Sequence, residues 1–404
     1  MFGVKKTEII TDEKKIDELL SRGVEEVIEK DKLLSKLKSG KQLRIKLGID
    51  PTSSNIHIGR TIPLLKLRDF QELGHKIVLI IGDFTAVIGD TSDKESERPM
   101  LTEVQVKKNL ENYIDQVGKV IDITKCEIHY NSKWLSNLSY NEICKQADVF
   151  SLSDFISREN IKKRLDTGKR ISLRELMYPL MQGYDSVAIK SDVEIGGTDQ
   201  RFNLLAGREL QRYYKQEPQD IITNPLVEGL DGRKMSSSWG NTINLLDFAN
   251  DMYGKVMSLH DNFIIKYFTL TTRVGLDIIE NYKTALVSGT NPKDIKMKLA
   301  YELVRLYFSD NEAKKAEKYF TNTFSRKEVP EDVMEIVTSK GADIKDLLVE
   351  SKIVSSNAEW RRLVEGNAVS IVGTEEVIKD SFIKAENTQV FRIGKKRFVK
   401  VVVR

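Results

Sequence analysis

Two segments of the chain combine residue types that suit phosphate chemistry. In GIDPTSSNIHIGR at 48–60, a strand-like run ends at Gly48, an acid and a turn follow, and a helix is expected to open at His57 and Gly59. The unpaired N–H groups of a helix N-terminus attract anions, and a glycine there lets a nucleotide approach the backbone. An imidazole can donate to phosphate oxygens as charge develops on them. An ordinary strand-to-helix turn with a capping histidine would have the same pattern, so this segment does not decide alone.

The second segment, DGRKMSSSW at 231–239, is rich in glycine and serine and follows a late strand-like run. Its Lys234 offers a point charge, its serines offer hydroxyl donors, and its glycine permits movement. A mobile lid over a polyphosphate needs these three properties. Together the two segments predict a nucleotide bound between a fixed helix start and a closing loop.

Alternating strands and helices are expected to position these segments. LRIKLGI at 43–49 alternates as a strand does, residues 57–74 have the pattern of a helix, and KIVLIIGDF at 76–84 is a continuous apolar run typical of a buried strand. A helix is expected before this unit, over 12–40. Three further strands are expected, at 127–131, 192–196 and 221–227. The pattern predicts an α/β domain with a doubly wound, mostly parallel, Rossmann-like sheet, whose ligands gather beyond the carboxyl ends of the strands.

Helical periodicity replaces the strand pattern from about residue 247. Asn291 and Pro292 supply an N-cap and a first-turn proline ahead of apolar residues at helical spacing. After a breaker-rich interval, Ser356 and Glu359 form a capping-box pattern before a short helix, which a strand and a basic hairpin follow. The sequence therefore predicts three domains: an α/β domain at 1–245, a helical domain at 246–335 and a small α+β domain at 342–404.

Positive charge is concentrated at the end of the chain. The protein has 64 basic and 60 acidic residues, a net charge of +4, and residues 345–404 contain 12 basic and 8 acidic residues, which is the same excess. Such a cluster favours a partner with a phosphate backbone, although a solvated charged face would also explain it.

Composition excludes several classes of protein. A chain of 404 residues, 40% hydrophobic and 31% charged, is expected to fold into more than one globular domain. It lacks an apolar run of about 18 residues and the apolar core of a secretory signal, so a cytoplasmic location without membrane contact is expected. Two cysteines, Cys126 and Cys144, cannot build a disulfide framework, and no spacing predicts a zinc site.

Several motifs resemble those of one enzyme family. HIGR at 57–60 and KMSSS at 234–238 resemble the HIGH and KMSKS signatures of class I aminoacyl-tRNA synthetases. IGDTSDKESER at 88–98, YPLMQGYDS at 178–186 and GGTDQRFN at 196–203 resemble segments of bacterial tyrosyl-tRNA synthetases, and KLGIDPT is similar to the second bacterial branch. The closing module, SSNAEWRRLVEGNAVSIVG onward, is similar to the S4-type RNA-binding domain, which gives the basic tail a partner in tRNA.

This resemblance implies a role for each matching residue. Asp185 would accept the hydroxyl of the substrate tyrosine, Asp90 would hold its amino group with help from Tyr178 and Gln182, and Gln200 would contact its carboxyl region. Tyr178, Gln182 and Asp185 are spaced to share one helix face. The residues expected on the ATP side are Gly48, Asp50, Thr52, His57, Gly59, Arg60, Asp199, Lys234 and Ser237. The expected catalytic residues are His57, Lys94, Arg98 and Lys234. The residues expected to contact tRNA are Arg361, Arg362, Lys395, Lys396 and Arg397.

The resemblance also implies the reaction. The carboxylate of L-tyrosine would attack the α-phosphate of ATP, and the tyrosyl group would then pass from the adenylate to the 3′ end of tRNA(Tyr). ATP would be a substrate accompanied by Mg²⁺, with no permanently bound cofactor and no metal held by protein side chains. A homodimer with an interface near 105–165 is expected.

Three residues depart from the family pattern. Arg60 replaces the second histidine of HIGH, Ser237 replaces the second lysine of KMSKS, and Lys46 lies where many bacterial members offer a tyrosine hydroxyl to the substrate. We expect Asp185 to carry more of the recognition and the loop to give less cationic help. Two alternatives stay open: a synthetase paralogue that only binds RNA, and an enzyme of this fold that activates another aromatic amino acid such as tryptophan.

Overall fold

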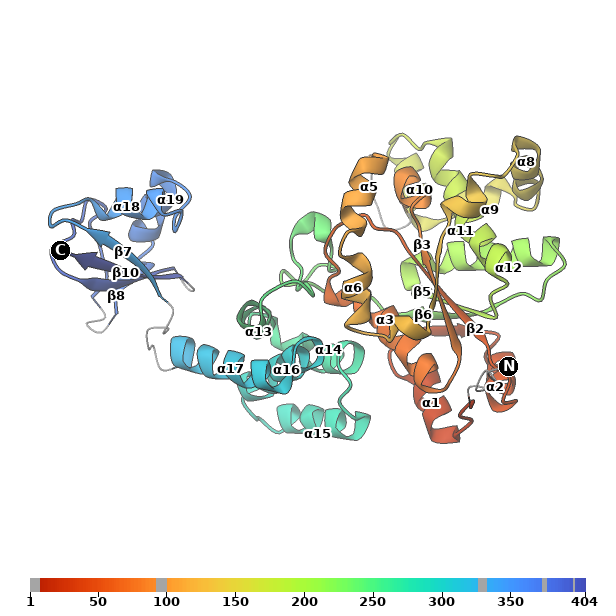
Figure 1. Ribbon diagram of the computed structural model, residues 1–404, viewed down its shortest axis with the longest axis horizontal. Coiled ribbons are helices and arrows are strands. Elements are labelled where there is room, and N and C mark those ends of the chain that lie inside the picture. The colour runs from red at the N-terminus through yellow and green to blue at the C-terminus, as the bar shows by residue number, and fades with distance from the viewer. Residues whose placement is uncertain (1–7, 92–99, 326–332, 373–375, 395–396) are drawn as a thin grey trace, which may run out of the picture. The chain divides into compact units, whose positions relative to one another are not determined.

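The computed structural model describes residues 8–91, 100–325, 333–372, 376–394 and 397–404 (Figure 1). The chain separates into two compact units, Met1–Ser309 and Asp310–Arg404. The boundary expected after residue 245 lies within the first unit. A functional division between 1–245 and 246–335 therefore stays a prediction.

A six-stranded sheet forms the centre of the first unit (Figure 1). In spatial order its strands are β1 (Glu26–Ile28), β6 (Asp220–Asn224), β5 (Val193–Gly197), β2 (Arg44–Ile49), β3 (Lys76–Ile81) and β4 (Glu127–Tyr130). Neighbouring strands pair in parallel except β1, which is antiparallel to β6. The predicted doubly wound, mostly parallel sheet is confirmed. Strand order reverses between β2 and β5, and ligands of such sheets bind in the crevice beyond this point.

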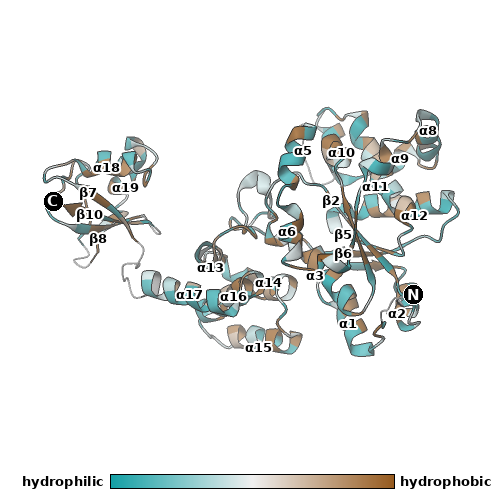
Figure 2. Ribbon diagram, in the orientation of Figure 1, coloured by the Kyte–Doolittle hydropathy of each residue, from teal (hydrophilic) through white to brown (hydrophobic). Residues whose placement is uncertain are grey.

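Burial explains why the central strands form. Ile77, Val78, Leu79, Ile80 and Ile81 of β3 are all buried, as expected for a strand covered on both faces. Figure 2 shows hydrophobic residues along the central strands. The long helix after β2, α3 (Ile58–Glu72), begins at the N-cap residue His57 and ends before Gly74, whose φ of 90° favours glycine.

The single helix expected over 12–40 is wrong. α1 (Glu13–Ser21) ends shortly before Gly23, which has a φ of 60°, and β1 then pairs with β6 before α2 (Lys30–Lys38) begins. Val27 and Ile28 are β-branched and find partners on β6, so pairing at the sheet edge prevails over the helical pattern.

The remaining helices of the first unit lie around the sheet and beyond it (Figure 1). Those before β6 are α4 (Thr85–Ile88), α5 (Glu103–Leu110), α6 (Tyr113–Gly118), α7 (Ser132–Leu135), α8 (Tyr140–Asp148), α9 (Leu152–Ile156), α10 (Glu159–Asp166), α11 (Leu173–Ile189) and α12 (Arg201–Tyr213). Those after β6 are α13 (Ala249–Met257), α14 (Ile264–Thr271), α15 (Leu276–Val287) and α16 (Pro292–Tyr307). Asn291 caps α16 with Pro292 in its first turn, as predicted. The hydroxyls of Thr61 on α3 and Tyr307 on α16 lie 2.8 Å apart, which joins the later helices to the α/β region.

The second unit begins with α17 (Asp310–Phe320) and contains a four-stranded sheet. Its strands, in spatial order, are β7 (Met334–Thr338), β10 (Arg397–Val403), β9 (Gln389–Ile393) and β8 (Val369–Ile371). Two helices, α18 (Ile344–Glu350) and α19 (Asn357–Glu365), contribute Leu348 and the fully buried Trp360 to its core. Ser356 caps α19 and β9 pairs antiparallel with β10, so the predicted N-cap and hairpin are confirmed. The reciprocal half of the capping box is not formed, because the Glu359 carboxylate accepts from the backbone N–H of Ser355 at 2.6 Å instead. Among the described helices, none is long and apolar enough to cross a membrane.

Candidate active site

A pocket of about 280 Å³ lies at the carboxyl ends of β2 and β5. The predicted site residues that line it are Gly48, Asp50, Thr52, His57, Gly59, Arg60, Asp90, Tyr178, Gln182, Asp185, Asp199, Gln200, Lys234 and Ser237. The N-terminus of α3, the loop at residues 231–239 and the polar face of α11 thus line one cavity. Lys94 and Arg98 lie outside the described residues.

Asp50 connects the turn after β2 to two other elements. Its Oδ2 accepts a hydrogen bond of 2.8 Å from the hydroxyl of Tyr178 on α11, and its Oδ1 accepts one of 2.8 Å from the hydroxyl of Thr85 on α4. Burial and the neighbouring carboxylates of Asp50 and Asp90 raise the pKa of Tyr178 well above its ordinary value. Tyr178 is therefore a neutral donor that holds the Asp50 carboxylate in the pocket wall.

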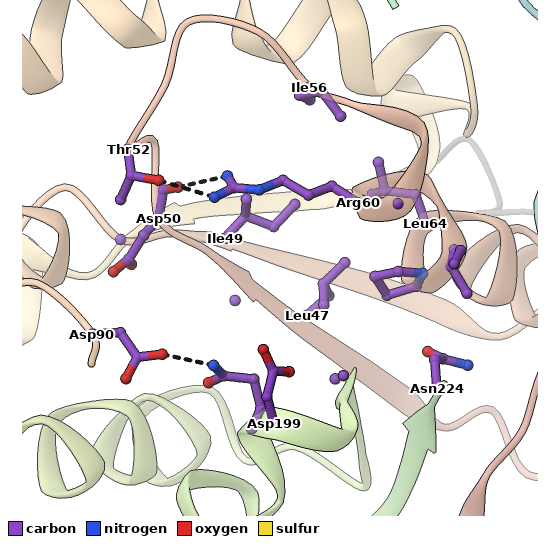
Figure 3. A pocket seen from close by; sticks show the side chains of 18 of the residues that line it. Leu47, Ile49, Asp50, Thr52, Ile56, Arg60, Leu64, Asp90, Asp199 and Asn224 are labelled. Atoms are coloured by element: carbon purple, nitrogen blue, oxygen red, sulfur yellow. Dashed lines mark hydrogen bonds between the residues drawn. The ribbon is translucent and has the colours of Figure 1, made fainter. Parts of the chain in front are cut away.

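Arg60 turns back onto the same turn (Figure 3). Its guanidinium donates to the hydroxyl of Thr52 at 2.9 Å, to the backbone carbonyl of Asp50 at 3.3 Å and to the hydroxyl of Tyr113 at 3.3 Å. The longer side chain that replaces the family's second histidine therefore fastens the Asp50–Thr52 turn while its charge stays at the pocket wall.

His57 is buried at the N-cap of α3. Burial, followed by the positive charges of Arg60 and Lys234, lowers the pKa of its imidazole to about 3. Within the described residues, its Nδ1 has no hydrogen-bond partner. A neutral imidazole facing the cavity can donate or accept a hydrogen bond at neutral pH, but it does not add a cation.

Asp185 is a buried carboxylate with two neutral N–H donors. Trp134 donates its indole N–H to Oδ1 at 2.8 Å, and Asn131 donates its side-chain amide to Oδ2 at 3.3 Å. Burial raises the pKa of Asp185 to about 7, and the charge of Lys46 and these two donors oppose the rise. No sequence pattern singled out Asn131 and Trp134, although Asn131 directly follows β4 and so reaches the same sheet edge.

A chain of side-chain amides links the other predicted tyrosine contacts. Gln200 donates to Oδ2 of Asp90 at 2.6 Å, and Asn203 on α12 donates to the amide oxygens of both Gln200 and Gln182 at 3.0 Å (Figure 3 draws the Asp90 bond). Asn203 is fully buried, and its residue type alone did not predict a place in the site. It orients both glutamine side chains through their oxygen atoms.

The loop at residues 231–239 also contributes to the pocket wall. Lys234 forms an ion pair of 2.8 Å with Asp199, which lies two residues after the end of β5. Asn241 accepts from the backbone N–H of Ser236 at 2.8 Å and donates to Asp231 at 2.7 Å, so a second contact fastens the loop. Residues 231–239 contain one lysine, Lys234. Its ion pair with Asp199 holds it at the cavity, as the sequence predicts.

Comparison with known proteins decides the family. The model for "tRNA synthetases class I (W and Y)" matches residues 38–325. The chain is 43% identical to the tyrosine–tRNA ligase of Thermotoga maritima over 386 aligned residues. The aligned region covers 95% of this chain and 96% of the relative. It is also 43% identical to the tyrosine–tRNA ligase of Shewanella oneidensis over 396 aligned residues, and this region covers 96% of the chain and 99% of the relative. The chain belongs to the class I tRNA synthetases.

Solved structures agree with this synthetase in fold. The tyrosyl-tRNA synthetase of Archaeoglobus fulgidus, complexed with L-tyrosine, is 23% identical, with a TM-score of 0.61 over 75% of this chain and 99% of that chain. The truncated mitochondrial enzyme of Coccidioides posadasii is 24% identical, with a TM-score of 0.60 over 75% of this chain and 91% of that chain.

The predicted tRNA contacts lie in the second unit of the synthetase. Arg361 and Arg362 on α19 are exposed. Arg397 on β10 instead pairs with Glu359 at 2.9 Å and donates to the carbonyl of Ile353 at 2.5 Å. Lys395 and Lys396 lie outside the described residues.

Proposed function

We propose that this synthetase is a tyrosine–tRNA ligase. It activates L-tyrosine with ATP, releasing pyrophosphate, and transfers the tyrosyl group from the adenylate to the 3′ end of tRNA(Tyr), releasing AMP. The observation that carries the proposal is the pocket shared by Asp185, the His57 turn and Lys234. A buried acceptor at one end and a polyphosphate site at the other suit an amino acid whose phenol and carboxylate point in opposite directions.

Recognition of tyrosine is assigned to the α11 side of the pocket. Asp185 accepts the substrate hydroxyl. Phenylalanine is disfavoured because it would cover this buried carboxylate without supplying the hydroxyl donor. Asp90, Tyr178 and Gln182 hold the ammonium group, and Gln200 contacts the carboxyl region. Each of these side chains is already fixed by hydrogen bonds within the protein, which limits the entropy lost on binding.

Catalysis on the nucleotide side is assigned to charge stabilisation and positioning. The substrate carboxylate attacks the α-phosphate in line, so the protein needs no nucleophile of its own. Gly48, Asp50, Thr52, Gly59, Arg60 and Ser237 bind ATP, and Asp199 contacts the ribose. Lys234, the neutral His57 and the loop cations Lys94 and Arg98 stabilise the charge that grows on the phosphates.

The described residues do not gather three or more His, Cys, Asp or Glu side chains in a group able to hold a metal ion. The pocket carboxylates are engaged by protein donors, as Asp50 is by Tyr178 and Thr85. We therefore expect Mg²⁺ to arrive with ATP, held mainly by the phosphates, where it neutralises their charge.

A homodimer and an RNA-binding second unit complete the proposal. Large apolar side chains are exposed across α5 and α8–α11, and such surface favours a protein interface. They are Val104, Tyr140, Leu152, Ile156, Leu165 and Leu173. The second unit, with its S4-like sequence and exposed arginines on α19, binds tRNA through phosphate contacts.

Pyrophosphate exchange tests this function directly. The wild-type protein is assayed with ATP and labelled pyrophosphate, separately with tyrosine, phenylalanine and tryptophan. Exchange with tyrosine alone is expected, and charging of tRNA(Tyr) follows in a second assay. Asp185→Ala is expected to abolish exchange, whereas Asp251→Ala, at an exposed acid on α13, serves as a folded control. Exchange driven by tryptophan would indicate another amino acid, and exchange with none would indicate an RNA-binding paralogue.

A further inference from the structure

Lys46 is a charged side chain with no access to solvent. It lies on β2, two residues before Gly48, yet it does not line the pocket. Its ammonium group pairs with Glu194 at 2.7 Å, donates to the hydroxyl of Ser186 at 2.7 Å and donates to the carbonyl of Gln182 at 3.0 Å. Burial of an ammonium is costly unless it is paired and hydrogen-bonded, and these three acceptors meet that requirement.

The partners of Lys46 belong to one buried polar network. Lys46 and Glu194 are register partners on the adjacent strands β2 and β5. The second carboxylate oxygen of Glu194 accepts from Ser186 at 3.0 Å and from the side-chain amide of Gln219. A Cβ atom on Gly207 would lie 2.7 Å from that amide nitrogen and 3.0 Å from the Ser186 hydroxyl, so the glycine on α12 leaves room for the network.

This network holds α11 on both sides of Asp185. Gln182 comes three residues before Asp185 and Ser186 comes directly after it, and Lys46 binds both. Asp185 and the side chain of Gln182 face the pocket, so the contacts behind them fix how far this helix face lies from the sheet. A buried network that is fully paired specifies geometry, because alternative positions leave charged groups unpaired.

We propose that Lys46 is a positioning residue for tyrosine recognition, which fixes the Gln182–Asp185 segment of α11 and supplies the positive charge that helps to keep Asp185 an ionised acceptor. This inference rests on the proposed function. It assigns to Lys46 an action through Asp185 and not a contact with the substrate.

The electrostatic part follows from the groups around Asp185. From β2 the charge of Lys46 lowers the pKa of Asp185, and from β5 that of Glu194 raises it. From the α7 side Asn131 and Trp134 are neutral donors, and on α11 the nearby Tyr178 stays protonated. With burial raising the pKa to about 7, a change in the Lys46–Glu194 pair alters the ionised fraction of Asp185 near neutral pH.

Two variants change this field in opposite directions. Lys46→Met alone would leave a buried, unpaired Glu194 and endanger folding, so the double variant Lys46→Met/Glu194→Gln removes both charges and keeps the volume. Glu194→Gln alone keeps the cation, and Lys46 retains the Gln182 carbonyl and the Ser186 hydroxyl as acceptors. A matched control, Lys66→Met/Asp69→Asn, removes another buried lysine pair, which joins α3 residues away from the pocket at 3.2 Å.

The readout is the pH dependence of kcat/KM for tyrosine in pyrophosphate exchange, which reports the ionisation of the free enzyme. In the double variant, the acidic limb of the profile of kcat/KM against pH should shift to higher pH by about one unit. KM for tyrosine should rise several-fold, with KM for ATP unchanged. Glu194→Gln should shift the acidic limb to lower pH. The control should lose stability without moving the limb.

The outcomes separate this inference from the proposed function. If the wild type exchanges with tyrosine but Glu194→Gln leaves the limb in place, Lys46 has a purely structural role and the inference is overturned. Glu194→Gln decides this even where the double variant fails to fold. If the wild type does not exchange with tyrosine, the proposed function fails first, and this inference fails with it.

Discussion

Gly82 and Asp50 lie so close together that a side chain at residue 82 would displace the carboxylate. A Cβ atom on Gly82 would lie 1.9 Å from Oδ1 of Asp50 and 2.3 Å from the hydroxyl of Thr85. These two atoms form the hydrogen bond that connects the turn after β2 to α4. The absence of a side chain directly after β3 is therefore a condition for the position of Asp50 in the pocket.

Gly82→Ala should reduce both stability and activity. The added methyl group must displace Asp50 or Thr85, which we expect to cost about 1–3 kcal/mol of unfolding free energy, as other overpacking substitutions do. Because Asp50 also binds Tyr178, the KM values for ATP and tyrosine should both rise. Chemical denaturation and exchange kinetics measure the two effects.

Gly48→Ala provides the contrast on the same pocket. A Cβ atom at residue 48 meets no protein atom within 4 Å, and Gly48 lines the cavity. Stability should stay within about 0.5 kcal/mol of the wild type, while KM for ATP rises because the methyl group occupies ligand space. Equal destabilisation by both substitutions would contradict the steric explanation for Gly82.

Tyr178→Phe tests the link between the two halves of the site. The hydroxyl of Tyr178 lies 2.8 Å from Oδ2 of Asp50, and its removal leaves this half-buried carboxylate without one of its donors, at a cost of about 1–3 kcal/mol. KM for tyrosine and KM for ATP should rise together in exchange assays. Tyr184→Phe is the control, because Tyr184 lies on the same helix and contacts Tyr214. A rise in KM for tyrosine alone would show that Tyr178 acts only on the amino acid.

Asp185→Asn should make the protein more stable and less active. The pKa of Asp185 is raised from its ordinary 3.8 to about 7 by burial, so the folded state binds a proton that the unfolded state releases between these values. Wild-type stability should therefore fall as pH rises from about 4 to 7, and the loss should remain above pH 7. Removal of the charge should recover up to about 4 kcal/mol at pH 8 and nothing at pH 3, measured by urea denaturation. A gain of equal size at both pH values would contradict this origin.

The sequence was sufficient to predict where the pocket forms. Parallel strands end at a common sheet edge, so the residues after 43–49 and 192–196 had to meet. The spacing of Tyr178, Gln182 and Asp185 fixed their common helix face, since α11 spans all three. Local sequence patterns predict the common sheet edge and the shared helix face, because both depend only on periodicity and chain direction.

The contacts that tune the site were beyond the sequence. Asn203 and Trp134 have no spacing that distinguishes them from other polar or aromatic residues, and their roles depend on which helix packs opposite. The pairing of Lys46 with Glu194 depends on the register between β2 and β5, which no local pattern specifies. No sequence pattern specifies what the Arg60 guanidinium contacts within the protein, whereas the structure shows that it donates to the hydroxyl of Thr52.

Substitution of arginines in the second unit should separate RNA contacts from internal ones. Arg361 and Arg362 are exposed on α19, so Arg361→Ala/Arg362→Ala should weaken tRNA binding. The plot of log affinity against log salt concentration should become less steep, with the magnitude of its slope reduced by about two. Arg397 is held by Glu359 and Ile353, which connect β10 to α19 and the preceding loop. Arg397→Ala should therefore lower the unfolding temperature of the full chain and change the salt slope by less than the double variant does. Filter binding across a salt series with calorimetry distinguishes the two variants, and a larger slope change for Arg397→Ala would show that its guanidinium leaves Glu359 to contact phosphate.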